Sequence, residues 1–309
     1  MPEIVIAEFM DETAVEHMRQ RHDTLYDATL VDRPDALAAA LAEARVLVVR
    51  NRTQVRGALL AAAPRLEMVG RLGVGLDNID LAACAARAIA VVPATGANDL
   101  SVAEYVITTA MTLLRGAYAA SGAVAAGAWP RQTLIGRELS GRTIGLLGYG
   151  AIAREVAARA RALGMAVVAH DPLLDAADPA WGTTRPMTLD ALLVAADVVS
   201  LHVPLTEATR HMIGAAELAR MKDDAILVNA ARGGVIDETA LAAALRAGRI
   251  GGAALDVFEA EPLTAEAGKK FVGLPNLILT PHIAGVTVES NIRVSAVIAD
   301  AVLAHLEAR

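Results

Sequence analysis

Short runs of β-branched and aliphatic residues alternate with longer stretches rich in alanine and leucine along almost the whole chain. This alternation is typical of repeated βα units, in which parallel strands are covered by helices. The composition agrees, because 55% of the 309 residues are hydrophobic but only 3% are aromatic. The interior therefore has to be built from Ala, Val, Leu and Ile, the usual material of strands that are buried on both faces. We predict an α/β protein with parallel sheets.

The predicted strands form two series. The first series comprises Glu3–Ala7, Val46–Val49, Met68–Gly70 and Ile89–Val92. The second comprises Thr143–Leu147, Ala166–His170, Val198–Leu201, Ala225–Asn229, Gly252–Asp256 and Leu277–Thr280. Six strands with intervening helices have the size of a complete dinucleotide-binding domain.

Two long helical patterns, at about Leu100–Arg115 and Glu289–Glu307, are suited to connect two domains. In that arrangement residues 1–97 and 286–309 form one domain, and residues 98–285 form a second domain inserted into it. A chain of 309 residues is long enough for two cores of ordinary size. The segment Gly116–Glu138 has scattered apolar residues and a weak helical pattern, which fits a subunit contact.

Charge and hydropathy narrow the functional classes. The formal net charge of −7 and the lack of a clustered basic stripe argue against nucleic-acid binding. Charges interrupt every apolar run before the roughly 20 residues that a membrane-spanning helix needs, and the N-terminus lacks the pattern of a secretory signal. We therefore expect a cytoplasmic protein with no membrane partner. Cys84 lies in an alanine-rich helical stretch and is predicted to be a buried apolar residue, not a nucleophile.

A glycine-containing turn follows the first strand of the second series. Its residues, Gly148-Tyr149-Gly150-Ala151-Ile152-Ala153, lie between that strand and a helix. In this position Gly148 permits a tight turn, Gly150 lets the backbone approach a pyrophosphate, and Ala153 lets the helix pack closely on the sheet. The N–H groups at the helix N-terminus then face the phosphates.

Asp171 stands at the end of the next strand, 21 residues after Gly150. A carboxylate there accepts hydrogen bonds from both ribose hydroxyls of NAD and repels the 2′-phosphate of NADP. Leu173 and Leu174 follow it, with no arginine to bind that phosphate. NAD is therefore the predicted cofactor. The alternative is an exposed turn that happens to contain glycines, with Asp171 capping the next segment.

Three further motifs resemble those of the D-isomer-specific 2-hydroxyacid dehydrogenases. They are Val228–Asp237, Ala253–Pro262 and Thr280–Gly285. The resemblance extends over nearly the whole chain, and within the family it is closest to short phosphoglycerate dehydrogenase-like members. It implies two Rossmann-like parallel-sheet domains. An NAD-binding domain, residues 98–285, would be inserted into a flavodoxin-like substrate domain, residues 1–97 and 286–309, with the substrate between them.

The resemblance assigns the catalytic roles to Arg232, Glu261 and His282. Arg232 would bind the substrate carboxylate, which a planar guanidinium matches. His282 would exchange a proton with the substrate hydroxyl, since imidazole titrates near neutral pH. Glu261 would orient the imidazole and favour its protonated form. Taken singly, each residue also has a purely structural explanation, as a strand cap, a surface charge or a loop residue.

The resemblance also implies which residues contact the cofactor, and no metal site is expected. The cofactor set is Gly148, Gly150, Ala151, Ile152, Asp171, Val203, Pro204, Ala230, Ala231, Arg232, Asp256, His282 and Gly285. A second histidine, His202, also ends a strand near the cofactor crevice, but it matches the segment lining the adenine side. We assign it no catalytic part.

A loop in the first domain is expected to hold the substrate together with Arg232 and His282. By resemblance, the backbone N–H groups of Val74 and Gly75 would bind its carboxylate, and Arg50 and Arg71 would lie near a second anionic group. The first choice of substrate is a 3-phosphoglycerate-like acid. The alternatives are another dianionic hydroxy acid such as 3-sulfolactate, or ordinary surface roles for the arginines.

The expected function is an NAD-dependent 2-hydroxyacid dehydrogenase, and the resemblance suggests a homodimer that is joined through Gly116–Glu138. A rival from another class is an NAD-sensing scaffold of the corepressor kind, which shares the fold but usually adds disordered tails. Formate dehydrogenase is a rival among enzymes. It is known for glutamine at the position of Glu261, so this glutamate favours keto-acid reduction.

Overall fold

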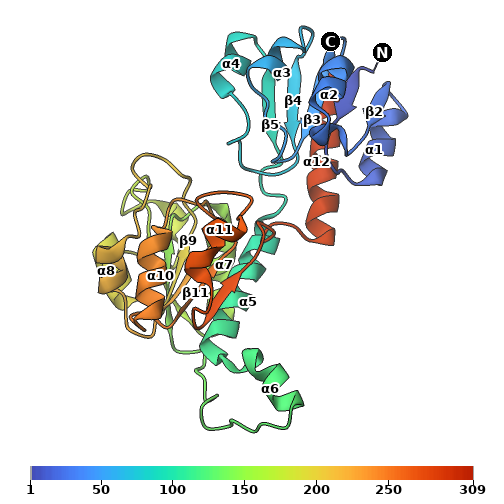
Figure 1. Ribbon diagram of the computed structural model, residues 1–309. Helices are drawn as coiled ribbons and strands as arrows, with labels where there is room; N and C mark the ends of the chain where they lie inside the picture. The colour runs from blue at the N-terminus through green and yellow to red at the C-terminus, as the bar shows by residue number, and fades with distance from the viewer. Residues whose placement is uncertain (1, 309) are drawn as a thin grey trace. The chain divides into compact units, whose positions relative to one another are not determined.

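The computed structural model describes residues 2–308 and divides into two compact units. Unit 1 joins the chain up to Asn98 to the segment from Val286 onward, and unit 2 spans Asp99–Gly285. The elements of both units are labelled in Figure 1. Each unit has its own sheet and its own buried clusters.

Unit 1 has a parallel sheet whose strand order, within the described residues, is β2-β1-β3-β4-β5. The strands are β1 Ile4–Ile6, β2 Thr24–Tyr26, β3 Val46–Val49, β4 Met68–Arg71 and β5 Ala90–Pro93. The helices are α1 Glu12–Arg19, α2 Pro34–Leu41, α3 Ala58–Ala61, α4 Leu81–Ala86 and α12 Val288–Glu307, with the 3₁₀ turn η1 Leu30–Asp32. This is the flavodoxin-like order, which confirms the prediction for this part of the chain. The C-terminal helix α12 packs against strand β4 of this sheet, although the two are distant in sequence (Figure 1).

Unit 2 has a longer parallel sheet of order β12-β11-β10-β9-β6-β7-β8 over the described residues. The strands are β6 Thr143–Leu147, β7 Ala166–His170, β8 Arg185–Pro186, β9 Val198–Leu201, β10 Ile226–Asn229, β11 Gly252–Leu255 and β12 Leu277–Leu279. The helices and 3₁₀ turns are α5 Asp99–Arg115, η2 Ala117–Ala120, α6 Ser121–Ala125, α7 Ala151–Ala162, η3 Pro179–Trp181, α8 Leu189–Ala195, α9 Ala215–Arg220, α10 Glu238–Arg246, α11 Ala265–Gly268 and η4 Lys269–Phe271. The chain order reverses between β6 and β9, as in a Rossmann sheet, and ligands bind such sheets at this switch point.

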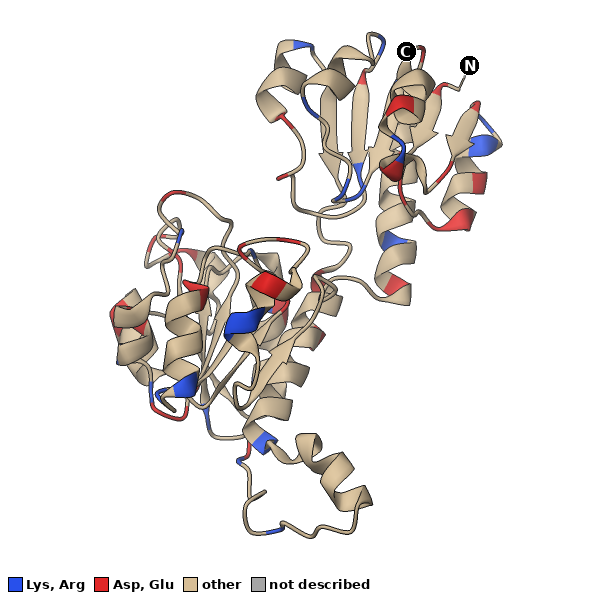
Figure 2. Ribbon diagram, viewed as in Figure 1, with Lys and Arg blue, Asp and Glu red and all other residues tan. Residues whose placement is uncertain are grey.

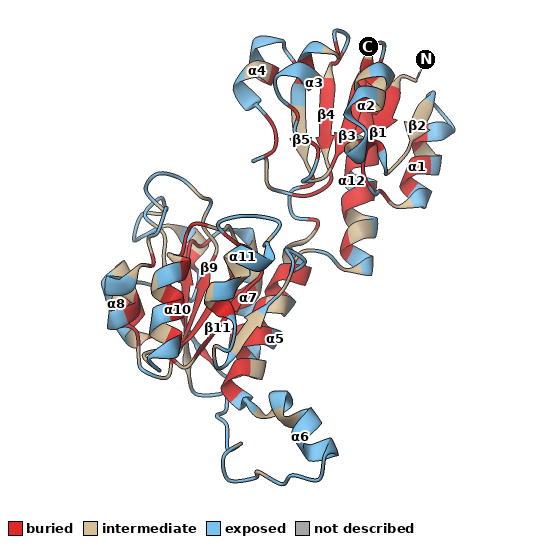
Figure 3. Cartoon of the chain, in the orientation of Figure 1, coloured by how far each residue is buried: buried red, intermediate tan, exposed pale blue. Residues whose placement is uncertain are grey.

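Alternating side chains of each unit 2 strand enter two different cores. On β6, Ile144 and Leu146 are buried with α5 and α7, whereas Leu147 is buried with α8, α9 and α10. Successive strand residues point to opposite faces, so a sheet covered on both sides needs apolar residues at every position. Figure 3 shows the result, with buried strands and helices that expose their outer faces.

Two smaller expectations can be compared with the structure. Cys84 is fully buried in the unit 1 core, as predicted, and burial raises the pKa of its thiol. Each helix in the described part of the chain is too short or too polar to cross a bilayer.

The segment 116–138 extends from unit 2 and carries the short helix α6. Figure 3 colours nearly all of it as exposed. Its apolar side chains Tyr118, Trp129 and Ile135 are 67%, 80% and 75% exposed. Large apolar side chains that are this exposed on one segment suit a surface that a partner covers.

Candidate active site

Three loops at one edge of the unit 2 sheet carry the predicted catalytic residues. Arg232 follows β10, Glu261 follows β11, and His282 follows β12. These strands are neighbours and run parallel, with Asn229 paired to Leu255 and Leu255 paired to Leu279. The carboxyl ends of parallel strands lie at the same edge, and for this reason residues up to 50 positions apart meet there.

His282 and Glu261 form a direct pair. Nδ1 of His282 lies 2.7 Å from Oε2 of Glu261, and the N–H of Phe258 donates to Oε1 of the same carboxylate at 2.9 Å. Burial on its own would raise the pKa of the Glu261 carboxyl. The hydrogen bonds from His282 and Phe258, with the charges of His282 and Arg232, outweigh burial and lower this pKa below its usual value. Glu261 is therefore an anion at neutral pH and is held by two donors.

Arg232 lies in a tight loop that Asn229 organises. The Asn229 amide donates to the carbonyl of Arg232 at 2.9 Å and accepts from the N–H of Ala231 at 3.0 Å. The Arg232 guanidinium donates to the carbonyl of Ala231 at 2.6 Å, and its charge also acts on Glu261. The sheet edge thus presents a cation beside the imidazole–carboxylate pair.

The next residue, Gly233, allows this loop to touch the loop that carries Glu261. A Cβ atom at Gly233 would lie 1.7 Å from the carbonyl oxygen of Phe258, a distance that no side chain can adopt. The two backbones are in contact at a point one residue from Arg232 and three residues from Glu261.

Asp256 holds the third loop. Its backbone carbonyl accepts from the N–H of His282, and its two carboxylate oxygens accept from Ile283 and Ala284, each at 2.8 Å. His282 has a φ of +56°, in the left-handed region that a non-glycine residue adopts only at a cost. The N–H groups of three successive residues donate to Asp256, and these hydrogen bonds fix the backbone of the loop and keep His282 in this conformation.

The turn at Gly148–Gly150 has the geometry that a diphosphate needs. Gly148 has a φ of +85°, and a Cβ there would lie 2.5 Å from the carbonyl oxygen of His202. A Cβ at Gly150, the N-cap of α7, would meet no other atom within 4 Å, and no side chain caps the helix there. Open space before uncapped N–H groups at a helix N-terminus suits an anion, and the residues fit NAD.

The Asp171 carboxylate is fixed at the end of β7. Its Oδ2 accepts from the N–H of Tyr149 at 2.8 Å, and its Oδ1 accepts from the N–H of Leu173 at 3.0 Å. The Tyr149 ring is buried and stacks on Trp181 with 5.1 Å between the ring centroids. The turn and the acid are therefore tied together. The other residues expected near the cofactor lie in the loops after β9, β10 and β12 or in the first turn of α7: Ala151, Ile152, Val203, Pro204, Ala230, Ala231 and Gly285.

His202 differs from His282 in its surroundings. Its Nε2 lies 2.9 Å from Oγ of Ser200, and burial lowers the pKa of His202 to about 4. A histidine with this pKa is neutral at physiological pH and cannot exchange a proton efficiently there. The geometry gives no reason to move the acid–base role from His282 to His202.

In unit 1, Arg50 directly follows strand β3, and Arg71 is the last residue of the neighbouring strand β4. Val49 of β3 pairs with Arg71 of β4, so Arg50 lies one residue beyond the position opposite Arg71. Figure 2 shows basic segments at this end of the unit 1 strands. The Arg50 guanidinium donates to Oδ1 of Asn291 and lies 5.4 Å from the centre of the Phe9 ring. Burial lowers the pKa of Arg50, although Glu8 and Tyr26 oppose this effect. A partly desolvated cation of this kind favours an anionic ligand.

Two residues that contact Arg50, Glu8 and Asn291, were not predicted from the sequence. Glu8 is buried, and its carboxylate accepts from the N–H groups of Arg50, Arg52 and Thr53, which fixes the loop after β3. The sequence did carry a signal for Glu8, because it is a charged residue that directly follows the apolar run Ile4–Ala7. Nothing in the local sequence marks Asn291. In the loop after β4, Val74 is exposed and Gly75 is half-buried.

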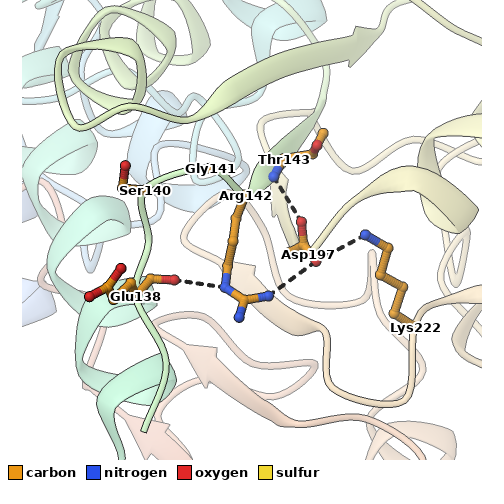
Figure 4. Close-up of a pocket in the computed structure, with 7 residues that line it drawn as sticks. All are labelled: Glu138, Ser140, Gly141, Arg142, Thr143, Asp197 and Lys222. Carbon is orange, nitrogen blue, oxygen red and sulfur yellow. Dashed lines mark hydrogen bonds and ion pairs between the residues drawn. The ribbon is translucent and has the colours of Figure 1, made fainter.

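A polar cavity of about 570 Å³ lies elsewhere, at the amino ends of β6 and β9 (Figure 4). Asp197 accepts from the N–H of Thr143 at 2.8 Å and pairs with Lys222 at 2.9 Å and with Arg142 at 3.4 Å. Burial would raise the pKa of Asp197, but these donors and cations lower it overall. The cluster joins strand ends and carries no predicted site residue.

Comparisons with known proteins show the family of this chain. Residues 107–284 match the family described as D-isomer specific 2-hydroxyacid dehydrogenase, NAD binding domain. An (S)-sulfolactate dehydrogenase of Chromohalobacter salexigens is 54% identical over 100% of both chains. A D-3-phosphoglycerate dehydrogenase of Archaeoglobus fulgidus is 38% identical over 96% of this chain, which spans only 56% of that relative. The crystal structure of an Aquifex aeolicus D-lactate dehydrogenase complexed with NAD and lactic acid has a TM-score of 0.85 and 28% identity, covering 99% of this chain and 96% of that one.

The open space at Gly150 gives a direct test of the dinucleotide site. Gly150 has φ −74° and ψ −166°, which any residue adopts, so Gly150→Ala should fold normally. Its methyl group would occupy the space through which a diphosphate approaches the backbone. We expect the dissociation constant of NADH, measured by fluorescence titration, to rise by about tenfold or more.

Gly122→Ala is the control, because Gly122 also faces open space but lies in α6. It should leave NADH binding unchanged. Equal NADH affinity in Gly150→Ala and the unmodified protein, with both folded, would contradict the assignment of the turn.

Proposed function

The chain belongs to the D-isomer specific 2-hydroxyacid dehydrogenases, which are NAD-dependent oxidoreductases, and from this premise we propose that it interconverts (S)-sulfolactate and 3-sulfopyruvate. The full-length relation to an (S)-sulfolactate dehydrogenase carries the choice of substrate. From the sequence alone, a 3-phosphoglycerate-like acid comes first and sulfolactate second. We reverse that order, because the phosphoglycerate dehydrogenase relative is more distant and nearly twice as long.

The stereochemistry of this proposal is consistent with the family. Sulfur outranks the carboxylate oxygens in substituent priority, so replacing the methyl group of D-lactate by a sulfonatomethyl group changes the descriptor from R to S. The arrangement about the carbon stays the same. An S-configured sulfolactate is therefore a D-isomer, as the family description requires.

The charges in unit 1 support a sulfonate. We propose that Arg50 and Arg71 bind it, with Glu8 as the nearby carboxylate that acts on Arg50. The two positive charges of Arg50 and Arg71 and the negative charge of Glu8 leave a net positive charge of one, which suits a ligand group with a single negative charge. A phosphate monoester carries nearly two charges at neutral pH, because its second pKa is about 6. Both groups present three oxygens to a guanidinium, so charge is the distinguishing property.

In unit 2, we assign proton transfer to His282. Nδ1 of its ring is engaged by Glu261, which leaves Nε2 for the substrate hydroxyl. During oxidation the O–H proton passes to Nε2, the C–H bond breaks with its electron pair, and the C–O bond becomes a carbonyl. NAD, when bound, supplies the acceptor for that hydride. Reduction runs through the same residues in reverse.

Glu261 and Arg232 complete the proposed chemistry. The Glu261 carboxylate stabilises the imidazolium that forms on His282, and its lowered pKa keeps it ionised well below neutral pH. Arg232 is placed to bind the substrate carboxylate through its guanidinium and to polarise the developing carbonyl. Asp171 and the Gly148–Gly150 turn would hold the ribose and the diphosphate. The backbone N–H groups of Val74 and Gly75 would bind the substrate carboxylate from unit 1.

We also propose that the chain forms a homodimer through the segment 116–138. The exposed Tyr118, Trp129 and Ile135 support this, since burying such side chains removes apolar area from water. Sedimentation velocity should show a dimer, and Trp129→Glu should shift it toward the monomer. A monomeric unmodified chain at micromolar concentration would rule the proposal out.

A panel of 2-keto acids assayed with NADH tests the substrate. We expect kcat/KM to be highest for 3-sulfopyruvate, lower for the phosphorylated analogue 3-phosphohydroxypyruvate and lowest for pyruvate. A higher value for the phosphorylated acid would return the function to the 3-phosphoglycerate-like class. No turnover of any keto acid, with NADH binding intact, would favour the NAD-sensing scaffold.

Within that panel, Arg50→Gln separates sulfonate binding from general effects on the fold. The KM for sulfopyruvate should rise by about tenfold to a hundredfold, because a charge-assisted contact is lost. The KM for pyruvate, which lacks the sulfonate, should change by less than about threefold. Equal changes for both acids would remove Arg50 from the sulfonate site.

The acid–base pair is tested by His282→Ala and Glu261→Gln. His282→Ala should lower kcat by about 10² to 10⁴ and leave NADH binding nearly intact. In Glu261→Gln the imidazolium loses its anionic partner, so kcat should also fall, by about tenfold or more, with NADH binding nearly intact. A loss of NADH binding in the first variant, or an unchanged kcat in the second, would reassign these residues.

A further inference from the structure

A chain of two hydroxyl groups connects helix α5 to the loop that carries His282. Oη of Tyr105 lies 2.6 Å from Oγ1 of Thr280, and Thr280 Oγ1 donates to Oδ1 of Asp256 at 2.6 Å. A hydroxyl has one proton to donate. Because Thr280 donates its proton to Asp256, Tyr105 has to be the donor to Thr280.

The end of this chain is the residue that fixes His282. Asp256 is 1% exposed and accepts the N–H groups of His282, Ile283 and Ala284. Thr280 is itself held, since its N–H donates to the carbonyl of Leu255. A carboxylate group can rotate about its bond to Cβ unless its oxygens are engaged from more than one direction. The Thr280 hydroxyl adds a third hydrogen bond to this carboxylate, on the oxygen Oδ1 that also accepts from Ile283, and it is the one of the three that comes from outside the residues 282–284.

We infer that Tyr105 and Thr280 are positioning residues for the dehydrogenase reaction, which hold the Asp256 carboxylate in the one orientation that keeps His282 at its left-handed φ. The inference rests on the proposed role of His282. We call Tyr105, Thr280 and Asp256 the His282 clamp. Neither Tyr105 nor Thr280 has to touch the substrate or the cofactor to act in this way.

The surroundings of Tyr105 fit a donor that stays protonated. Tyr105 lies on α5, which packs on β10 and β11, and its ring contacts the buried cluster of that face. Burial, together with the charge of Asp256, raises the pKa of Tyr105 to about 12, against the opposing hydrogen bond to Thr280. The phenol is therefore neutral and able to donate throughout the working range of pH.

The strain at His282 explains why such a clamp matters. A non-glycine residue in the left-handed region stores strain energy and stays there only while its surroundings enforce it. Relaxation of the loop would release that energy and swing the imidazole away from its place beside Glu261. A displacement of about 1 Å at a reacting group lowers turnover by about a hundredfold.

Amide hydrogen exchange tests the clamp without any substrate. Tyr105→Phe keeps the ring but removes the donor, and Thr280→Val keeps the shape but removes the hydroxyl. In both variants the amides of residues 282–284 should exchange about fivefold faster, whereas Thr280→Ser should restore slow exchange. Thr109→Val is the matched control, because it removes a buried hydroxyl from α5 that donates to the Tyr105 and Val106 carbonyls, not to Asp256.

Kinetics with NADH and 3-sulfopyruvate, or with whichever acid of the panel is turned over, provides the second readout. Tyr105→Phe should lower kcat by about fivefold with KM for NADH nearly unchanged, and Thr280→Ser should retain most of kcat. Unchanged exchange at residues 282–284 in Tyr105→Phe would overturn the inference, as would equal effects in Thr109→Val. Failure of the proposed function appears separately, as full activity in His282→Ala, and leaves the exchange result standing as the test of the clamp.

Discussion

Contact between backbones determines the geometry of the candidate active site in unit 2. The loops after β10 and β11 touch at Gly233 and the Phe258 carbonyl, where even a methyl group would collide. The loop after β12 is bound to the end of β11 through Asp256. Because three adjacent parallel strands carry these loops, the register of the sheet determines the positions of Arg232, Glu261 and His282. The backbone therefore fixes where these three side chains begin, and their hydrogen bonds and charges act from those positions.

Much of the fold could be predicted from hydrophobic patterns. The strands that were not predicted were missed for physical reasons. All the predicted strands are present. Most of them are aliphatic runs buried on both faces, and the edge strands β5 and β12 are still aliphatic although they are only partly buried. The strand Thr24–Tyr26 was missed, since it lies at a sheet edge and is only half-buried, so its sequence needs no apolar run. Arg185–Pro186 is an exposed pair at the other sheet's edge, where proline is tolerated. These two edge strands are specified by their neighbours more than by their own residues.

The candidate site was predictable to a different degree in its two parts. The family resemblance pointed to residues 232, 261 and 282, and the structure places Glu261 and His282 in direct contact. Glu8, Asn291 and Tyr105 escaped prediction because their roles come from tertiary contacts with residues far away in sequence. Asn291 meets Arg50 across 241 positions, and Tyr105 meets Thr280 across 175. A pattern within one segment carries no information about such a partner.

The proposed roles of the residues explain why the reaction class follows from sequence more readily than the substrate does. The proposed catalytic residues of unit 2 would act on groups that every 2-hydroxy acid shares, namely the hydroxyl, the carboxylate and the hydrogen on the same carbon. They must therefore keep one geometry whatever the substrate. The group that differs among these acids would be bound by Arg50 and Arg71 in unit 1, where arginine suits sulfonate, phosphate and carboxylate alike. Under this proposal, choice among these anions would depend on the balance of charge around the arginines, and a buried carboxylate such as Glu8 would alter that balance without changing any arginine.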